Sequence, residues 1–132
     1  MTRLIDYAEA SAEVRAVYDD IKATRGIPDV TNFWKALAVH PPTLRRTWES
    51  LKAVMAPGAL DPLTKELLYL AVSIAHGCRY CIASHTASAR ARGMNEEMYG
   101  ELLAIVGMAA ETNRLATALD VPVDEIFRRD TR

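Results

Sequence analysis

Cys78 and Cys81 are the only cysteines of the chain, and they stand three residues apart. Gly77 precedes them and predicts the end of one helix, so Cys78 should open the next one, with both sulfurs on one face of its first turn and within reach of a disulfide. The free amide hydrogens and the partial positive charge at a helix N-terminus favour thiolate over thiol, and Arg79 adds a nearby cation. A thiolate attacks peroxides and disulfides, and its neighbour can close on the resulting sulfenic acid. The pair therefore predicts a thiol redox centre.

Two further side chains could manage the proton in such a centre. His85 follows Cys81 by four residues, one turn along the same side of the helix, where an imidazole could take the thiol proton. Only the tight turn at Gly77 separates this helix from the preceding one, so the two should pack antiparallel. Glu66 lies roughly 15 Å before that turn at 1.5 Å per residue, a depth comparable to that of His85. We therefore expect Glu66 to meet His85 and form a proton relay that ends at a sulfur.

The residues alone leave several readings of this cluster open. Helix-dipole reasoning favours Cys78 as the attacking thiol, whereas closeness to His85 favours Cys81. The two cysteines could also pack as small hydrophobic residues, or bind zinc with His85 and either His76 or Glu66. Glu66 could instead form a salt bridge with an arginine. Two later arginines, Arg90 and Arg92, read as solvated charges.

Helix start and stop signals divide the chain into helical segments. Ser11 caps a first segment that stops at Arg25-Gly26, and Thr31 or Asn32 starts a second one that ends before Pro41. The remaining segments are expected over residues 41–56, 62–76, 78–92 and from Asn95 to Pro122, the last one broken or bent at Gly100 or Gly107, and residues 124–132 form a charged tail that frays. No useful stretch alternates with a period of two, so the prediction is an all-α fold in a single domain over residues 1–132.

The charge balance and the hydrophobic pattern of the chain limit the classes of molecule that it is expected to bind. Sixteen basic and seventeen acidic residues give a net charge of −1, which offers no electrostatic footprint for nucleic acid or for an anionic membrane. No apolar run has the length of a signal peptide or of a membrane span, so we expect a cytoplasmic protein, whose thiols are kept reduced. Five apolar residues should form core or a subunit interface: Leu102, Leu103, Ile105, Val106 and Met108.

The spacing of Glu66, Cys78-x-x-Cys81 and His85 resembles that of the AhpD-like alkyl hydroperoxidases of the carboxymuconolactone decarboxylase superfamily. Residues 37–41, which read Leu-Ala-Val-His-Pro, are similar to the end of a helix in that family. Residues 60–67, which read Leu-Asp-Pro-Leu-Thr-Lys-Glu-Leu, are similar to the segment that delivers its glutamate. The resemblance covers roughly residues 30–119.

This resemblance implies an all-helical bundle that binds no cofactor or metal and assembles as a homo-oligomer, either a trimer or a hexamer. It implies that Cys81 attacks a hydroperoxide, that Cys78 resolves the product, and that an external thiol or dithiol recharges the pair. The best-characterised peroxidases of this kind carry a histidine where this chain has Tyr80, and tyrosine, with an ordinary pKa of about 10, is a poor base at neutral pH. Lactone decarboxylases of the superfamily generally lack the cysteine pair. A non-enzymatic redox-sensing or ligand-binding module and a zinc-binding structural protein are the alternative functions.

Overall fold

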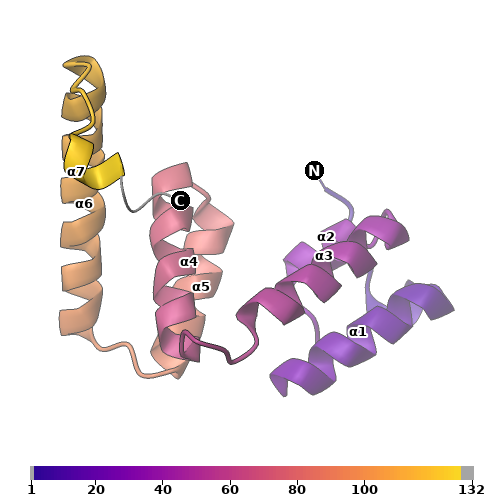
Figure 1. Cartoon of the computed structure of the whole chain (residues 1–132). Coiled ribbons are helices and arrows are strands. Elements are labelled where there is room, and N and C mark those ends of the chain that lie inside the picture. Colours follow the sequence, from indigo (N-terminus) through magenta and orange to yellow (C-terminus); the bar gives the residue numbers. More distant parts are fainter. Residues whose placement is uncertain (1, 129–132) are drawn as a thin grey trace. The chain divides into compact units, whose positions relative to one another are not determined.

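The computed structural model describes residues 2–128, and every regular element within them is helical (Figure 1). The predicted all-α fold class is therefore confirmed. The chain divides into two compact units, residues 1–56 and residues 57–132, and each is described by itself. The expectation of a single domain over residues 1–132 stays a prediction. Among residues 2–128, none of the helices combines the length and the apolar character that a bilayer-spanning segment requires.

The first unit contains a short 3-10 helix and three α-helices. Their bounds are η1 Tyr7–Glu9, α1 Ala12–Arg25, α2 Asn32–Leu37 and α3 Pro41–Met55. The predicted signals act where expected, because the Ser11 side chain accepts a hydrogen bond from the Val14 amide and Gly26 ends α1 with a φ of 65°. Pro41 occupies the first turn of α3, where its missing amide hydrogen costs nothing.

The core of the first unit is built from the apolar faces of its helices. Its largest buried side chains are Tyr18, Ile21, Trp34, Leu44 and Trp48. The two indoles meet edge to face, with ring centroids 5.4 Å apart. The indole N–H of Trp48 donates to Asp20 Oδ2 at 2.7 Å, so this buried donor is partnered.

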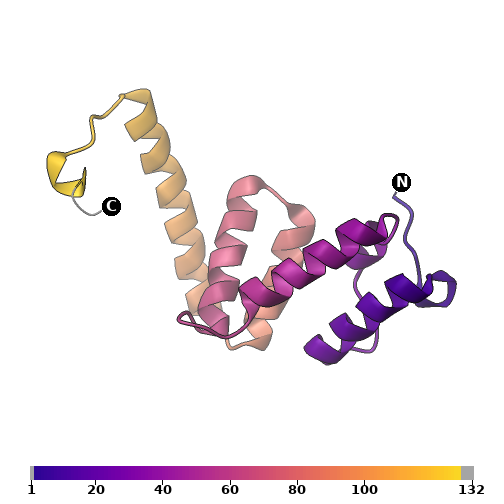
Figure 2. The same ribbon diagram turned by 45° about the vertical axis from the view of Figure 1, so that its right-hand side comes forward.

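The second unit contains the sequence motif and is formed by four helices. Their bounds are α4 Pro62–His76, α5 Arg79–Ala91, α6 Glu96–Ala118 and α7 Glu125–Arg128. Helices α4 and α5 form an antiparallel pair connected by a tight turn, as both ribbon views show (Figures 1 and 2). Helix α6 packs against α4, and the buried residues of this unit's core are Leu70, Ala89, Met94 and Leu102.

Helix α6 departs from the sequence expectation. It runs without a break from Glu96 through Gly100 and Gly107, because isolated glycines cost a helix only about 1 kcal/mol each and keep its hydrogen bonds. It ends at Ala118, ahead of Pro122, and Asp120 turns the chain with a positive φ of 47°. Part of the expected tail is helical (α7), and residues 129–132 lie outside the described residues.

The five apolar residues of α6 that were expected in core or interface divide between two environments. Leu102 is buried and Val106 is half-buried, whereas Leu103, Ile105 and Met108 are exposed. Within the second unit, the inward face of α6 therefore ends near Val106, and an apolar outer face continues beyond it.

Candidate active site

The turn between α4 and α5 fixes the position of Cys78. Gly77 adopts the left-handed conformation with a φ of 70°, and its amide donates to the carbonyl of Ile74. The Cys78 amide donates to the carbonyl of Ser73 at 3.1 Å, which completes the pair of hydrogen bonds of a Schellman motif. Gly77 thus ends α4, and the next residue, Cys78, caps α5. Backbone hydrogen bonds of the turn therefore fix where the first cysteine stands.

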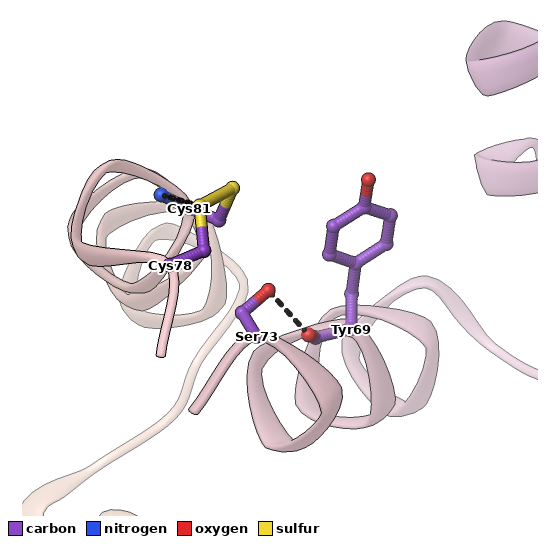
Figure 3. Close-up of a disulfide and its surroundings, with 4 residues drawn as sticks. All are labelled: Tyr69, Ser73, Cys78 and Cys81. Carbon is purple, nitrogen blue, oxygen red and sulfur yellow. Dashed lines mark hydrogen bonds between the residues drawn. A yellow bond between two sulfur atoms is a disulfide. The ribbon is translucent and has the colours of Figure 1, made fainter. Parts of the chain in front are cut away.

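Cys78 and Cys81 are joined as a disulfide at the N-terminus of α5 (Figure 3). Their Cα atoms lie 5.3 Å apart, within the ordinary range for a disulfide. Cys78 is the N-cap of α5, and its Sγ accepts a hydrogen bond from the Cys81 amide at 3.2 Å. The prediction that these sulfurs come within bonding reach is confirmed. The pair is in its oxidised state, two electrons away from the dithiol.

Glu66 and His85 meet across the antiparallel pair, as their matching depths predicted. Glu66 Oε2 lies 2.8 Å from His85 Nδ1, and the residue Glu66 is only 5% exposed. An ionised carboxylate only accepts hydrogen bonds, so opposite such a carboxylate Nδ1 would carry the proton and Nε2 would be the nitrogen that can exchange one. A sulfur held in a disulfide carries no proton, so the predicted relay to Cys81 could operate only in the reduced protein.

Glu66 has a second partner that the sequence interpretation treated only as a solvated charge. Arg92 is the residue that follows α5, and its Nε lies 3.7 Å from Glu66 Oε1. A buried carboxylate with a partner on each oxygen is compensated far better than a lone one. The proposed salt bridge of Glu66 to an arginine and its contact with His85 are therefore both present. Arg90 also has a partner, Glu96, at 3.0 Å.

Sequence reasoning missed two residues of α4 that lie beside the disulfide. The Tyr69 ring stacks on the His85 imidazole with centroids 3.8 Å apart and planes inclined by 24°. Ser73 is buried, and its hydroxyl donates to the Tyr69 carbonyl at 2.8 Å. The available signal was spacing, because Tyr69 follows Glu66 by three residues and Ser73 follows Tyr69 by four, which aligns all three on one face of α4.

Tyr80 lies between the two cysteines on the first turn of α5 and is 44% exposed. It is therefore a surface residue beside the disulfide. Within residues 2–128, no three histidine, cysteine, aspartate or glutamate side chains converge as a metal site would require. With both sulfurs in a disulfide, the geometry does not favour the zinc alternative.

The arrangement supports two-electron chemistry on sulfur. A disulfide at a helix N-terminus can accept two electrons to become a dithiol, and the helix dipole favours the thiolates that result. The Glu66–His85 pair supplies an imidazole held at Nδ1 in the same unit, on the helix that carries the cysteines.

Known proteins share both the sequence and the fold. Residues 41–124 match the carboxymuconolactone decarboxylase family. An alkyl hydroperoxide reductase AhpD from Solibacter usitatus is 40% identical over 73 residues, which cover 55% of this chain and 40% of that protein. An uncharacterized protein in the cox locus of Paracoccus denitrificans is 38% identical over 60 residues, which cover 46% of this chain and 51% of that protein. The chain thus spans about two fifths to one half of the length of these curated relatives.

A solved structure matches over nearly the whole chain. The crystal structure of an alkylhydroperoxidase AhpD core from Rhodospirillum rubrum superposes with a TM-score of 0.92 at 57% sequence identity, covering 96% of each chain. Both the sequence and the fold therefore agree with the resemblance carried by the Glu66, Cys78-x-x-Cys81 and His85 spacing. The chain belongs to the carboxymuconolactone decarboxylase family, as an AhpD-like member.

Proposed function

We propose that the chain is a dithiol peroxidase that reduces hydroperoxides through Cys78 and Cys81. The observation that carries this proposal is the disulfide at the start of α5, on the helix whose His85 is held by buried Glu66. The names of two relatives, an alkyl hydroperoxide reductase and an alkylhydroperoxidase core, support the same chemistry.

The proposed reaction begins with the Cys81 thiolate attacking one oxygen of the hydroperoxide. The O–O bond breaks, an S–O bond forms, and the alkoxide leaves as an alcohol after taking a proton. Cys78 then attacks the sulfur of the Cys81 sulfenic acid, the S–S bond forms, and hydroxide leaves as water. The two thiol protons end on the alcohol and on water. An external thiol or dithiol returns two electrons and two protons to the disulfide.

The hydrogen bond to Cys78 fits the proposed recharging step. The Cys81 amide donates to Cys78 Sγ, and such a bond favours the thiolate of Cys78 once the disulfide opens. A stabilised thiolate is a good leaving group, so Cys78 is released readily when an external thiolate attacks Cys81. Cys81 stands one turn before His85, which makes it the sulfur nearer in sequence to the proposed base.

His85 and Glu66 manage the proton in this proposal. Glu66 holds Nδ1, so Nε2 accepts the proton of the attacking thiol and returns it to the leaving oxygen. Tyr80 completes the proposed site as a surface residue between the two cysteines, at the position of the family's histidine. A cytoplasmic location, where thiols are kept reduced, fits recharging by a thiol partner.

We also propose that the protein works as a homo-oligomer, a trimer or a hexamer. The support is an outer stripe on α6 and its C-cap of four exposed apolar residues at spacings of three, seven and four: Ile105, Met108, Leu115 and Leu119. Spacings of three, four and seven align side chains along one line of a helix, and apolar lines of this kind pack against other helices. Sedimentation velocity should give a species heavier than the monomer, and Ile105→Lys should shift it toward the monomer. A wild-type protein that sediments as a monomer would refute the proposed homo-oligomer.

The test of the proposed function is a panel of hydroperoxides and reductants on the purified protein. We expect consumption of at least one organic hydroperoxide with a dithiol, and a sulfenic acid on Cys81 that dimedone traps when Cys78 is serine. Oxidation of the pair without turnover would indicate the redox-sensing alternative. A sulfenic acid found only on Cys78 in the Cys81→Ser protein would reverse the order of the two sulfurs.

A further inference from the structure

Tyr69 touches the proposed base from a direction that Glu66 does not use. Glu66 approaches the edge of the imidazole at Nδ1, whereas the Tyr69 ring lies flat against its face, with centroids 3.8 Å apart and planes inclined by 24°. The two residues stand three positions apart on α4. One face of α4 therefore supplies both contacts to the His85 imidazole of α5.

The two contacts restrict different motions. A single hydrogen bond at Nδ1 fixes one atom and the tautomer, but it leaves the imidazole free to tilt about that atom. A flat ring pressed against the imidazole face opposes this tilt, because tilting would separate or overlap the two rings. Tyr69 also shields the imidazole: the His85 side chain is 13% exposed, while the residue Tyr69 is 36% exposed. With both contacts in place, the direction of Nε2 is set.

The same ring stands beside the cysteines. Figure 3 shows the Tyr69 ring on α4 and the disulfide on α5 projecting to the same side of the helix pair, with Ser73 between them. Ser73 is buried and donates to the Tyr69 carbonyl, which ties it to the same turn of α4. Tyr69 therefore projects on the same side of the helix pair as the sulfurs, and its ring stacks on the imidazole that we propose serves them.

We propose that Tyr69 is the positioning residue of His85, and that its ring rather than its hydroxyl does this by stacking on the imidazole face. The consequence for turnover rests on the proposed function, in which His85 moves the proton. The consequence for the imidazole itself does not depend on that function.

The first arm of the experiment reads the imidazole directly. Long-range ¹H–¹⁵N spectra of histidine-labelled oxidised protein should show His85, assigned by loss of its signal in His85→Asn, as one tautomer protonated on Nδ1. Tyr69→Phe should keep this pattern, because the ring remains. Tyr69→Leu, and Tyr69→Met as a second variant that better fills the volume, should give averaged or broadened signals. Tyr99→Leu is the matched control, since Tyr99 is a half-buried tyrosine of α6 beside Arg90.

The second arm measures hydroperoxide turnover of the same proteins. Tyr69→Phe should keep wild-type kcat, and the two non-aromatic variants should lose about tenfold in kcat with little change in KM, since misplacing a proton-transfer group by a fraction of an ångström is costly. Wild-type His85 spectra and kcat in folded Tyr69→Leu or Tyr69→Met would overturn the proposal, as would an equal spectral change in Tyr99→Leu. Absence of turnover in the wild type with ring-dependent spectra would refute the peroxidase function and leave the positioning role supported.

Discussion

Glu66 on α4 and His85 on α5 meet edge to edge, with Glu66 Oε2 2.8 Å from His85 Nδ1. Glu66 is buried, and Arg92 approaches its other carboxylate oxygen at 3.7 Å. A buried carboxylate needs such compensation, and here it gets it from a histidine on the cysteine-bearing helix and from the residue that ends that helix. The Glu66–His85 contact therefore both holds α4 against α5 and orients the imidazole that we propose as the base.

Glu66→Gln should slow hydroperoxide turnover without unfolding the protein. Glutamine keeps an acceptor of the same size for His85 Nδ1, so the free energy of unfolding should change by no more than about 1–2 kcal/mol. It loses the negative charge that supports a protonated imidazole, and turnover should fall by about ten- to a hundredfold. Thermal unfolding and steady-state kinetics measure the two effects.

The matched control is Glu101→Gln, which changes an exposed glutamate of α6. It should alter neither the rate nor the melting temperature. A large loss of melting temperature with an unchanged rate in Glu66→Gln would assign Glu66 a purely structural role.

Gly77→Ala should destabilise the protein by about 1–2 kcal/mol, because a residue with a Cβ is disfavoured at a φ of 70°. A Cβ built at this position meets no atom within 4 Å, so the cost lies in the backbone alone. Chemical denaturation gives the free energy of unfolding.

Gly100→Ala should have the opposite effect on stability, although it lies in the same unit as Gly77→Ala. Gly100 lies in continuous helix, and its added Cβ also meets nothing within 4 Å. Alanine should therefore stabilise the protein by about 0.5–1 kcal/mol. Equal effects of the two substitutions would contradict the assigned role of Gly77 as the left-handed end of α4.

Acid should lower the free energy of unfolding of the first unit, partly because the Asp20 carboxylate becomes protonated. The Lys52 ammonium and the Trp48 indole both donate to Asp20 Oδ2, and these hydrogen bonds lower the pKa of this carboxyl in the folded protein. The stabilisation is complete above about pH 4, the ordinary aspartate pKa, and is lost as the pH falls through the lowered folded value. Tryptophan fluorescence during urea unfolding at pH 7 and at pH 3 follows this loss.

Two variants separate the hydrogen bond from the charge at Asp20. Asp20→Ala should cost about 1–2 kcal/mol at pH 7, because the buried Trp48 N–H loses its acceptor. Asp20→Asn keeps an acceptor that does not titrate. The free energy of unfolding of this variant should therefore fall less between pH 7 and pH 3 than that of the wild type. If the free energy of unfolding fell equally in Asp20→Asn and in the wild type, Asp20 would not contribute to the loss of stability in acid.

The local signals of the sequence predicted helix ends well, because capping depends on a few neighbouring residues. Ser11, Asp61 and Asn95 each accept a hydrogen bond from the first turn that follows, and Gly77 ends α4 as its φ requires. The Glu66–His85 contact was also predictable, since a tight turn fixes the relative depth of residues on two antiparallel helices.

Contacts that depend on how the helices are rotated about their axes were not predictable in the same way. Tyr69 reaches His85, and Arg92 reaches Glu66, only because of the particular rotation of α4 against α5 and the rotamers that it permits. The unbroken course of α6 through Gly100 and Gly107 differs from the predicted break, because an isolated glycine costs a helix only about 1 kcal/mol and packing outweighs it.

The most direct test of the central claim is dithiol-coupled hydroperoxide consumption by wild type, Cys78→Ser, Cys81→Ser and the double-serine protein. Serine is nearly isosteric with cysteine but forms neither a thiolate nor a disulfide, and far-ultraviolet circular dichroism checks that each variant folds. We expect turnover in the wild type alone, with all three variants at the rate of the buffer. Wild-type turnover by the folded double-serine protein would contradict the account.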